Sequence, residues 1–127
     1  MEQTILVVDD EPDVVALIER TLRAEGYEVL KAFDGISALD LVSQERPDLV
    51  LLDIMMPTMS GYEVCQQITA NPDTQGIPVV CVSSAHGPDA RAQCLKAGAV
   101  TLVPKPFLPA ELVAQIQRHL PPPAEDD

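Results

Sequence analysis

The sequence is poor in aromatic residues, which make up 3% of the chain, with no Trp, two Tyr and two Phe. A folded core must therefore be built from the aliphatic side chains that supply most of the 46% hydrophobic fraction. Apolar runs are short, and none approaches the roughly 20 residues of a membrane-spanning helix. The first predicted strand begins at Thr4, which leaves no room for a signal peptide. We therefore expect a cytoplasmic protein that makes no contact with membranes.

Basic residues are also scarce, because eight Lys and Arg stand against twenty Asp and Glu, for a net charge of −12. A chain of this charge repels phosphate backbones and anionic lipids, which argues against direct binding to nucleic acid. The length suits one domain, expected over residues 1–120. Residues 121–127 carry three Pro and three acidic residues and are expected to be a Pro-rich acidic tail or the start of a linker.

Cysteine and histidine are too few and too scattered to indicate a soft metal site. Cys65, Cys81 and Cys94 are odd in number, lack the spacing of metal ligands and have apolar neighbours. They are predicted to be buried free thiols rather than disulfide or zinc ligands. His86 and His119 are predicted on a loop and near a helix end, as surface residues.

Short aliphatic runs alternate with amphipathic segments along the whole chain. The strands are predicted at Thr4–Val8, Tyr27–Ala32, Leu49–Asp53, Pro78–Val82 and Val100–Val103. The helices are predicted from Pro12 to Gly26, from Ile36 to before Pro47, from about Tyr62 to Thr69 and from His86 to Lys96. Phe107 and Pro109 lead into a last predicted helix, whose buried face runs from Leu112 to Leu120. Unbroken aliphatic strands and right-handed crossovers predict an α/β fold, a doubly wound five-stranded parallel sheet of order 2-1-3-4-5 flanked by five helices. This is a flavodoxin-like three-layer sandwich, and the more polar second strand is expected near a sheet edge.

Polar side chains follow four of the five predicted strands, namely Asp9 with Asp10, Asp53, Ser83 and Lys105. In the order 2-1-3-4-5 these four strands are neighbours, so their ends should form one pocket. Carboxylates that converge repel each other, by about 4 kcal/mol for two unit charges ~4 Å apart at an effective dielectric of 20. The lysine supplies one compensating charge. The remaining positive charge would come from a bound cation, and a set of oxygen ligands with open positions for water favours Mg²⁺.

Magnesium beside an ammonium and a hydroxyl group is typical of phosphoryl transfer. The predicted strand ends offer no Cys or His, and no glycine-rich loop follows the first strand to hold a nucleotide. The remaining nucleophile is Asp53, which would form an acyl phosphate. Each polar residue also has an ordinary interpretation, with Asp53 or Asp9 as a helix cap and Lys105 as a solvated loop residue. The pattern would be a coincidence only if all of these ordinary interpretations were true at the same time.

The sequence resembles the receiver domain of response regulators in two-component signalling. The likeness runs from about Thr4 to Leu120. It is carried by Ile5–Glu11, Leu51–Pro57 with Met59–Gly61, Ile77–Ser83 and Lys105–Phe107.

The resemblance implies that Asp53 accepts a phosphoryl group from a phosphohistidine of a sensor histidine kinase or phosphotransfer protein. It also implies that Asp10, Asp53 and the backbone carbonyl of Met55 ligate Mg²⁺, with Asp9 acting through water. Phosphorylation is expected to switch the face that binds a downstream protein effector. The domain is expected to be a monomer or weak dimer and not a turnover enzyme.

The resemblance further implies that Ser83 hydrogen-bonds one phosphoryl oxygen and that Lys105 pairs with another. The peptide bond between Lys105 and Pro106 is expected to be cis. Ser84 is the less favoured alternative for the hydroxyl. Leu102 stands where the family usually has an aromatic residue, so the ring-based form of its switch is not expected here.

Two other functions are compatible with the same sheet. A Mg²⁺-dependent phosphohydrolase would need a second acid or base near Asp53, but Met55 occupies that place. A flavodoxin-like cofactor binder would need a phosphate-accepting loop where Asp9 and Asp10 stand. Because Met55 and Ala85 leave the pocket mouth apolar, slow self-dephosphorylation is predicted.

Overall fold

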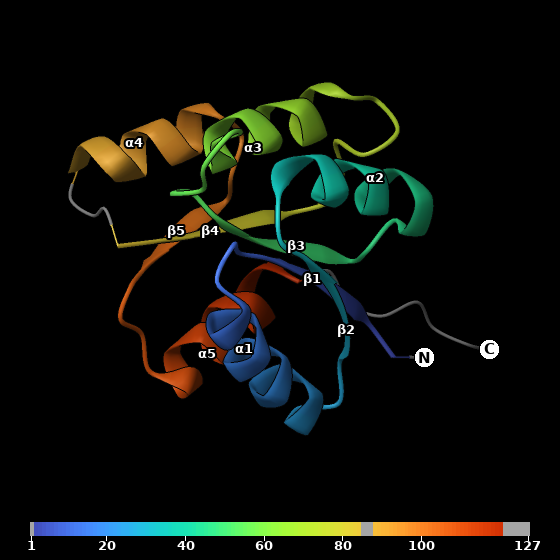
Figure 1. Cartoon of the computed structure of the whole chain (residues 1–127), viewed down its shortest axis with the longest axis vertical. Coiled ribbons are helices and arrows are strands. Elements are labelled where there is room, and N and C mark those ends of the chain that lie inside the picture. The colour runs from blue at the N-terminus through green and yellow to red at the C-terminus, as the bar shows by residue number, and fades with distance from the viewer. Residues whose placement is uncertain (1, 85–87, 121–127) are drawn as a thin grey trace.

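The computed structural model describes residues 2–84 and 88–120. Strands and helices alternate along the chain (Figure 1). The strands are β1 Thr4–Val8, β2 Glu28–Ala32, β3 Leu49–Asp53, β4 Val79–Ser83 and β5 Thr101–Pro104. The helices are α1 Pro12–Ala24, α2 Gly35–Glu45, α3 Gly61–Ala70, α4 Pro88–Lys96 and α5 Pro109–His119. All strand pairs are parallel, in the order β2-β1-β3-β4-β5. The predicted fold and the edge position of the second strand are confirmed.

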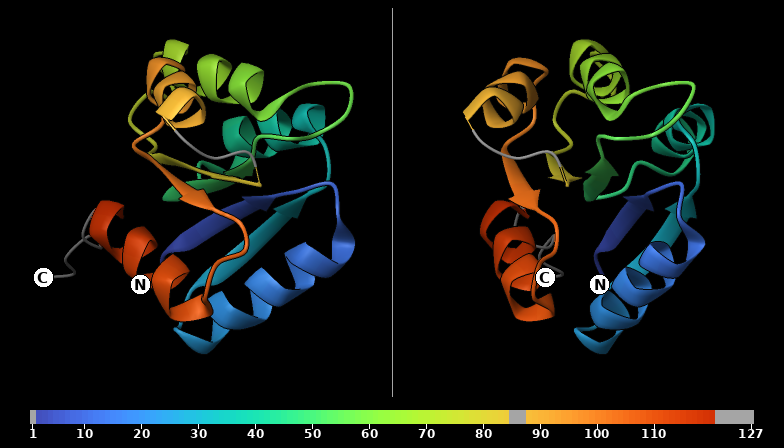
Figure 2. Two further views of the ribbon diagram at one scale, coloured as in Figure 1. Left: turned by 90° about the vertical axis from the view of Figure 1, so that its left-hand side faces the viewer. Right: turned by 60° about the vertical axis from the view of Figure 1, so that its left-hand side comes forward.

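Helices cover both faces of the sheet, with α1 and α5 on one side and α2, α3 and α4 on the other (Figures 1 and 2). Successive residues of β1 point to opposite faces, so Ile5 and Val7 pack under α1 and α5. Leu6 and Val8 pack under the other three helices. Because both faces are buried, the strand must be apolar at every position, which explains the unbroken aliphatic runs.

Several element boundaries differ from the predictions by a residue. The strand predicted from Tyr27 begins at Glu28 because the Tyr27 N–H donates to the carbonyl of Leu22, 3.2 Å away, at the end of α1. The fifth strand starts and ends one residue later than predicted and includes Pro104, which lies opposite Ser83 in the register with β4.

The fourth strand is shifted in the same way, and the third helix extends one residue further at each end. The predicted start of the fourth helix at His86 and the predicted tail, residues 121–127, lie outside the described residues.

The three cysteines are buried free thiols, as predicted, and come from three different elements. Cys65 lies on α3, Cys81 on β4 and Cys94 on α4, all within the core layer beneath these helices. The Cys65 thiol contacts the carbonyl of Ala97 at 3.4 Å. Within residues 2–84 and 88–120, no helix combines the length and apolarity that crossing a bilayer requires.

Candidate functional site at the carboxyl edge of the sheet

Asp53 is the last residue of β3 and is only 4% exposed. The strand places it between the ends of β1 and β4, at the edge where α/β sheets bind ligands. Its Oδ1 accepts a hydrogen bond from the N–H of Met55 at 3.3 Å. The chain then leaves the sheet, and the side chain of Met55 is 59% exposed.

A glycine lets α3 begin close to this strand end. The N–H of Gly61 donates to the carbonyl of Ile54 at 2.9 Å. A Cβ at this position would collide with the carbonyl oxygen of Asp53 and lie 2.7 Å from Cα of Ile54. Ser60 caps the helix by accepting from the N–H of Glu63. The start of α3 therefore packs directly against the backbone at the end of β3.

Asp9 and Asp10 follow β1 and complete an acidic cluster with Asp53. One carboxylate oxygen from each residue lies within 4.8 Å of the other two. Asp9 is 2% exposed and accepts a hydrogen bond from the N–H of Glu11 at 3.0 Å, whereas Asp10 is half-buried. The sequence thus predicted correctly that these three carboxylates converge.

Lys105, the residue after β5, reaches this cluster from the far edge of the sheet. Its Nζ lies 2.9 Å from Oδ2 of Asp9 and 3.5 Å from Oδ1 of Asp53. The Lys105 N–H donates to the carbonyl of Ser83 at 2.8 Å, and the bond to Pro106 is cis. The closer ion pair, with Asp9, was not foreseen, because the resemblance assigned the lysine to a phosphoryl oxygen.

The carboxylates and the amine of this cluster shift each other's pKa. Burial raises the pKa of Asp53, and the charge of Asp9 raises it further, while Lys105 acts in the opposite direction. For Lys105 burial alone lowers the pKa, but the hydrogen bond to Asp9 and the charges of Asp53 and Asp9 outweigh it, so the pKa is raised. One ammonium against three carboxylates leaves the cluster net negative.

These residues fit a hard divalent cation. Asp9, Asp10 and Asp53 offer only oxygen donors, as Mg²⁺ prefers, and the partial exposure of Asp10 leaves the cluster open to water. The excess negative charge of the cluster is what such an ion would neutralise.

Ser83 ends β4 beside this cluster and is 1% exposed, whereas Ser84 is exposed. The end of β4 is tied to β3 by a hydrogen bond from the N–H of Ile54 to the carbonyl of Val82 at 3.1 Å. Of the two residues predicted at the pocket mouth, Met55 is exposed there, and Ala85 lies outside the described residues.

Two features of the site were not found from the sequence. The motif around Met59, Ser60 and Gly61 was noticed, but nothing local shows that the glycine faces the backbone of Asp53. The pairing of Lys105 with Asp9 likewise has no local signal.

Comparison with known proteins gives consistent results. The family model described as "Response regulator receiver domain" matches residues 5–117. The curated "Response regulator PleD" of Caulobacter vibrioides is 42% identical over 117 residues, which cover 92% of this chain. The match covers 26% of PleD, so the chain spans about a quarter of this relative.

Solved structures share the fold closely. Chemotaxis protein CheY4 of Vibrio cholerae aligns with a TM-score of 0.90 and 29% identity, covering 94% of this chain and 100% of that one. A putative response regulator from Chloroflexus aurantiacus aligns with a TM-score of 0.89 and 32% identity, covering 93% of this chain and 97% of that one.

Proposed function

The chain belongs to the response regulator receiver domain family, and from this premise we propose that Asp53 accepts a phosphoryl group from a phosphohistidine of a sensor histidine kinase or phosphotransfer protein. Receiver domains are signalling domains that interact with kinases and effectors. The observation that carries the proposal is the cluster of Asp9, Asp10 and Asp53 with Lys105 at one edge of the sheet.

In the transfer, a carboxylate oxygen of Asp53 forms a bond to phosphorus as the bond from phosphorus to the imidazole nitrogen breaks. The electron pair of the broken bond stays on the imidazole, and the product is an acyl phosphate. Asp53 must be ionised to attack, and the nearby ammonium of Lys105 favours the ionised form.

The residues that would hold Mg²⁺ are Asp10, Asp53 and the backbone carbonyl of Met55, with Asp9 acting through water. A bound magnesium ion supplies neutralisation of the charge on the transferring oxygens. The cluster's oxygen donors and its uncompensated charge support this assignment.

Once Asp53 carries the phosphoryl group, Lys105 pairs with one of its oxygens and Ser83 donates a hydrogen bond to another. Lys105 directly follows β5, and Ser83 ends β4. These new contacts therefore displace the ends of both strands toward the phosphoryl group. We propose that the resulting shift of β5 and α4 changes the face that binds a downstream protein effector. The domain acts as a monomer or weak dimer, without catalytic turnover and without binding nucleic acid directly.

The test is intact mass spectrometry after incubation with Mg²⁺ and acetyl phosphate. The wild-type chain and the control Asp40→Asn, an exposed aspartate of α2, should each gain one phosphoryl group. Asp53→Asn should gain none while keeping its circular dichroism spectrum. Labelling of Asp53→Asn would contradict the assignment of the acceptor. Many turnovers of acetyl phosphate per chain would favour the phosphohydrolase instead.

A further inference from the structure

Three thiols meet inside the core layer beneath α3 and α4. Cys81, in the middle of β4, contacts the thiol of Cys65 on α3 and the thiol of Cys94 on α4. All three residues are 0% exposed, and all three are free thiols. The proposed phosphoryl transfer uses none of them, so their proximity belongs to no function described so far.

The helix that carries Cys94 is attached to the sheet by little buried surface. Of the nine residues of α4, all of which the structure describes, Cys94 alone is buried, and Ala90 is half-buried. The neighbouring α3 buries four of its ten residues. Because α4 buries so little, its local opening costs less free energy than that of α3.

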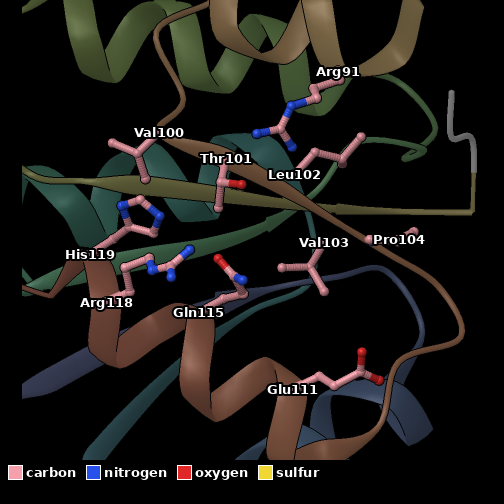
Figure 3. A pocket seen from close by; sticks show the side chains of 10 residues that line it. All are labelled: Arg91, Val100, Thr101, Leu102, Val103, Pro104, Glu111, Gln115, Arg118 and His119. Carbon is pink, nitrogen blue, oxygen red and sulfur yellow. The ribbon is translucent and has the colours of Figure 1, made fainter. Parts of the chain in front are cut away.

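Open space lies on both flanks of α4. A hollow of about 320 Å³ separates it from α5, with Arg91 of α4 on one side and Arg118 of α5 on the other (Figure 3). A second hollow, of about 230 Å³, lies between α3 and α4 and is lined by Tyr62 of α3 and Lys96 of α4. The helix α4 can therefore move away from the sheet without displacing α3 or α5.

Local opening of α4 changes the reactivity of Cys94. Burial raises the pKa of this thiol, and the charge of Arg91 acts in the opposite direction. The thiol is therefore inert while α4 is in place. When α4 lifts, the burial ends, whereas Arg91 moves with the thiol on the same helix. The thiolate, which is the nucleophilic form, then becomes accessible together with Cys81 on the strand beneath.

We propose that Cys81 and Cys94 form a redox site, which hydrogen peroxide converts to a disulfide that joins α4 to β4. In the first step the sulfur of Cys94 attacks one oxygen of the peroxide, the O–O bond breaks, and the departing hydroxide takes up a proton to give water. The sulfur of Cys81 then attacks the sulfenic acid formed on Cys94, the S–O bond breaks, and a second water molecule leaves. The two thiols lose two electrons and two protons, and one peroxide becomes two water molecules.

Cys65 is less suitable than Cys94 as the partner of Cys81. Its thiol contacts the carbonyl of Ala97 at 3.4 Å, and it lies on the better anchored α3. A disulfide requires the two Cβ atoms to approach to about 3.8 Å. In this approach α4 displaces one buried residue, Cys94, whereas α3 would displace four.

The test treats the whole chain with hydrogen peroxide, unfolds it and counts free thiols by labelling with N-ethylmaleimide. The untreated chain should take up three labels and the oxidised chain one, and dithiothreitol should restore all three. Peptide mapping without reductant should find the peptide of Cys81 joined to that of Cys94. Oxidation of the exposed Met55 adds an oxygen atom that dithiothreitol does not remove, so mass separates the two reactions.

Variants identify the reacting pair. Cys81→Ala and Cys94→Ala should each keep both remaining thiols after the same treatment. Cys65→Ala is the matched control, because it makes the same change in the same layer, and it should still lose two thiols. Peptide mapping of the wild type needs no variant, so an unstable variant does not prevent the test. A mapped disulfide between Cys65 and Cys81, or three labels after prolonged treatment, would overturn the proposal.

The disulfide has a consequence that rests on the proposed function, because α4 joined to β4 cannot make the shift expected after phosphorylation. The amide NMR shifts that Mg²⁺ and acetyl phosphate produce in residues 88–96 should be smaller in the oxidised chain than in the reduced chain. Equal shifts in two samples that have both gained the phosphoryl mass overturn this consequence and leave the redox site standing. Absence of the mass gain in the reduced chain is instead a failure of the proposed function.

Discussion

Lys105 and Asp9 are separated by 96 residues in the sequence, yet Nζ of the lysine lies 2.9 Å from Oδ2 of the aspartate. The two strands that they follow, β5 and β1, are not neighbours, because β3 and β4 lie between them. The lysine therefore spans the carboxyl edge of the sheet and contacts Asp53 on the way, at 3.5 Å. The charge of Asp53 is thereby connected to the end of β1 and to the end of the edge strand β5.

Lys105→Met should destabilise the protein, because it leaves Asp9 buried without its cation. We expect a loss of roughly 2–3 kcal/mol, between the values for exposed and buried ion pairs, measured by urea unfolding at pH 7. Lys31→Met, which breaks the exposed pair with Glu19, should cost much less, because solvent screens that pair. Equal losses in the two variants would contradict the importance of the buried pair.

The contribution of Lys105 also has a defined pH range. Its pKa is raised in the folded state above the usual 10.5, so its stabilisation is complete below pH 10.5 and is lost as the pH rises through the folded pKa. The difference in stability between wild type and Lys105→Met should therefore stay constant from neutral pH up to about pH 10.5 and shrink in more strongly alkaline solution.

Asp53→Asn should stabilise the metal-free protein at neutral pH. The pKa of Asp53 is raised in the folded state, which means that folding favours the protonated carboxyl group. The protonated group contributes its full stabilisation below the usual pKa of 3.8, and this contribution is lost as the pH rises through the folded pKa. The neutral amide of the Asp53→Asn variant cannot ionise, so the variant avoids both this loss of stability and the repulsion from Asp9. A gain of about 1 kcal/mol, or 3–5 °C in Tm, is expected at pH 7 and should vanish toward pH 3. Thermal unfolding in EDTA measures it, and a pH-independent difference would contradict the assigned cause.

Adding Mg²⁺ should raise the Tm of the wild type, since an ion that binds only the folded state stabilises it by about 2.7 kcal/mol at a hundredfold excess over Kd. Removing the ion with EDTA should reverse the shift. The effect should be much smaller in Asp10→Asn, which loses one charged oxygen ligand. Na⁺ at matched ionic strength serves as the control, and an equal shift with Na⁺ would indicate general screening of the net charge.

Gly61→Ala should disturb the site through the backbone. The added methyl would collide with the carbonyl of Asp53, which belongs to the end of β3 and cannot rotate away. We expect a loss of roughly 2–4 kcal/mol and slower phosphorylation by acetyl phosphate. Gly76→Ala is the matched control because a Cβ at Gly76 meets nothing within 4 Å. Wild-type stability of Gly61→Ala would show that α3 is not held against the strand end as described.

Self-dephosphorylation should be slow, because the exposed Met55 offers no carboxylate or amide to orient a water molecule beside Asp53. Met55→Asn should accelerate loss of the phosphoryl group severalfold, and Met55→Leu should not. Intact mass measured over time after removal of acetyl phosphate gives the rates. A wild-type half-life of seconds would contradict the prediction.

Much of the site could be predicted from the sequence because β1, β3 and β4 are buried aliphatic runs that end at, or are followed by, a polar residue. Leu49–Leu52 followed by Asp53 defines both the strand and the end at which the carboxylate emerges. Alternation of strands and helices, with right-handed crossovers, then leaves few possible sheet orders. The shifted start of β2 was not predictable in this way, because it depends on which carbonyl accepts the N–H of Tyr27.

The sequence by itself determined the alternation of strands and helices, the buried thiols and the end of the strands at which Asp9, Asp10 and Asp53 lie, because these follow from local periodicity and chain direction. Only the tertiary structure decided that Lys105 pairs with Asp9 and that Arg91 and Arg118 line one hollow. These contacts join side chains from segments far apart in the sequence. Their positions depend on how helices and strand ends pack in three dimensions, which no local pattern records.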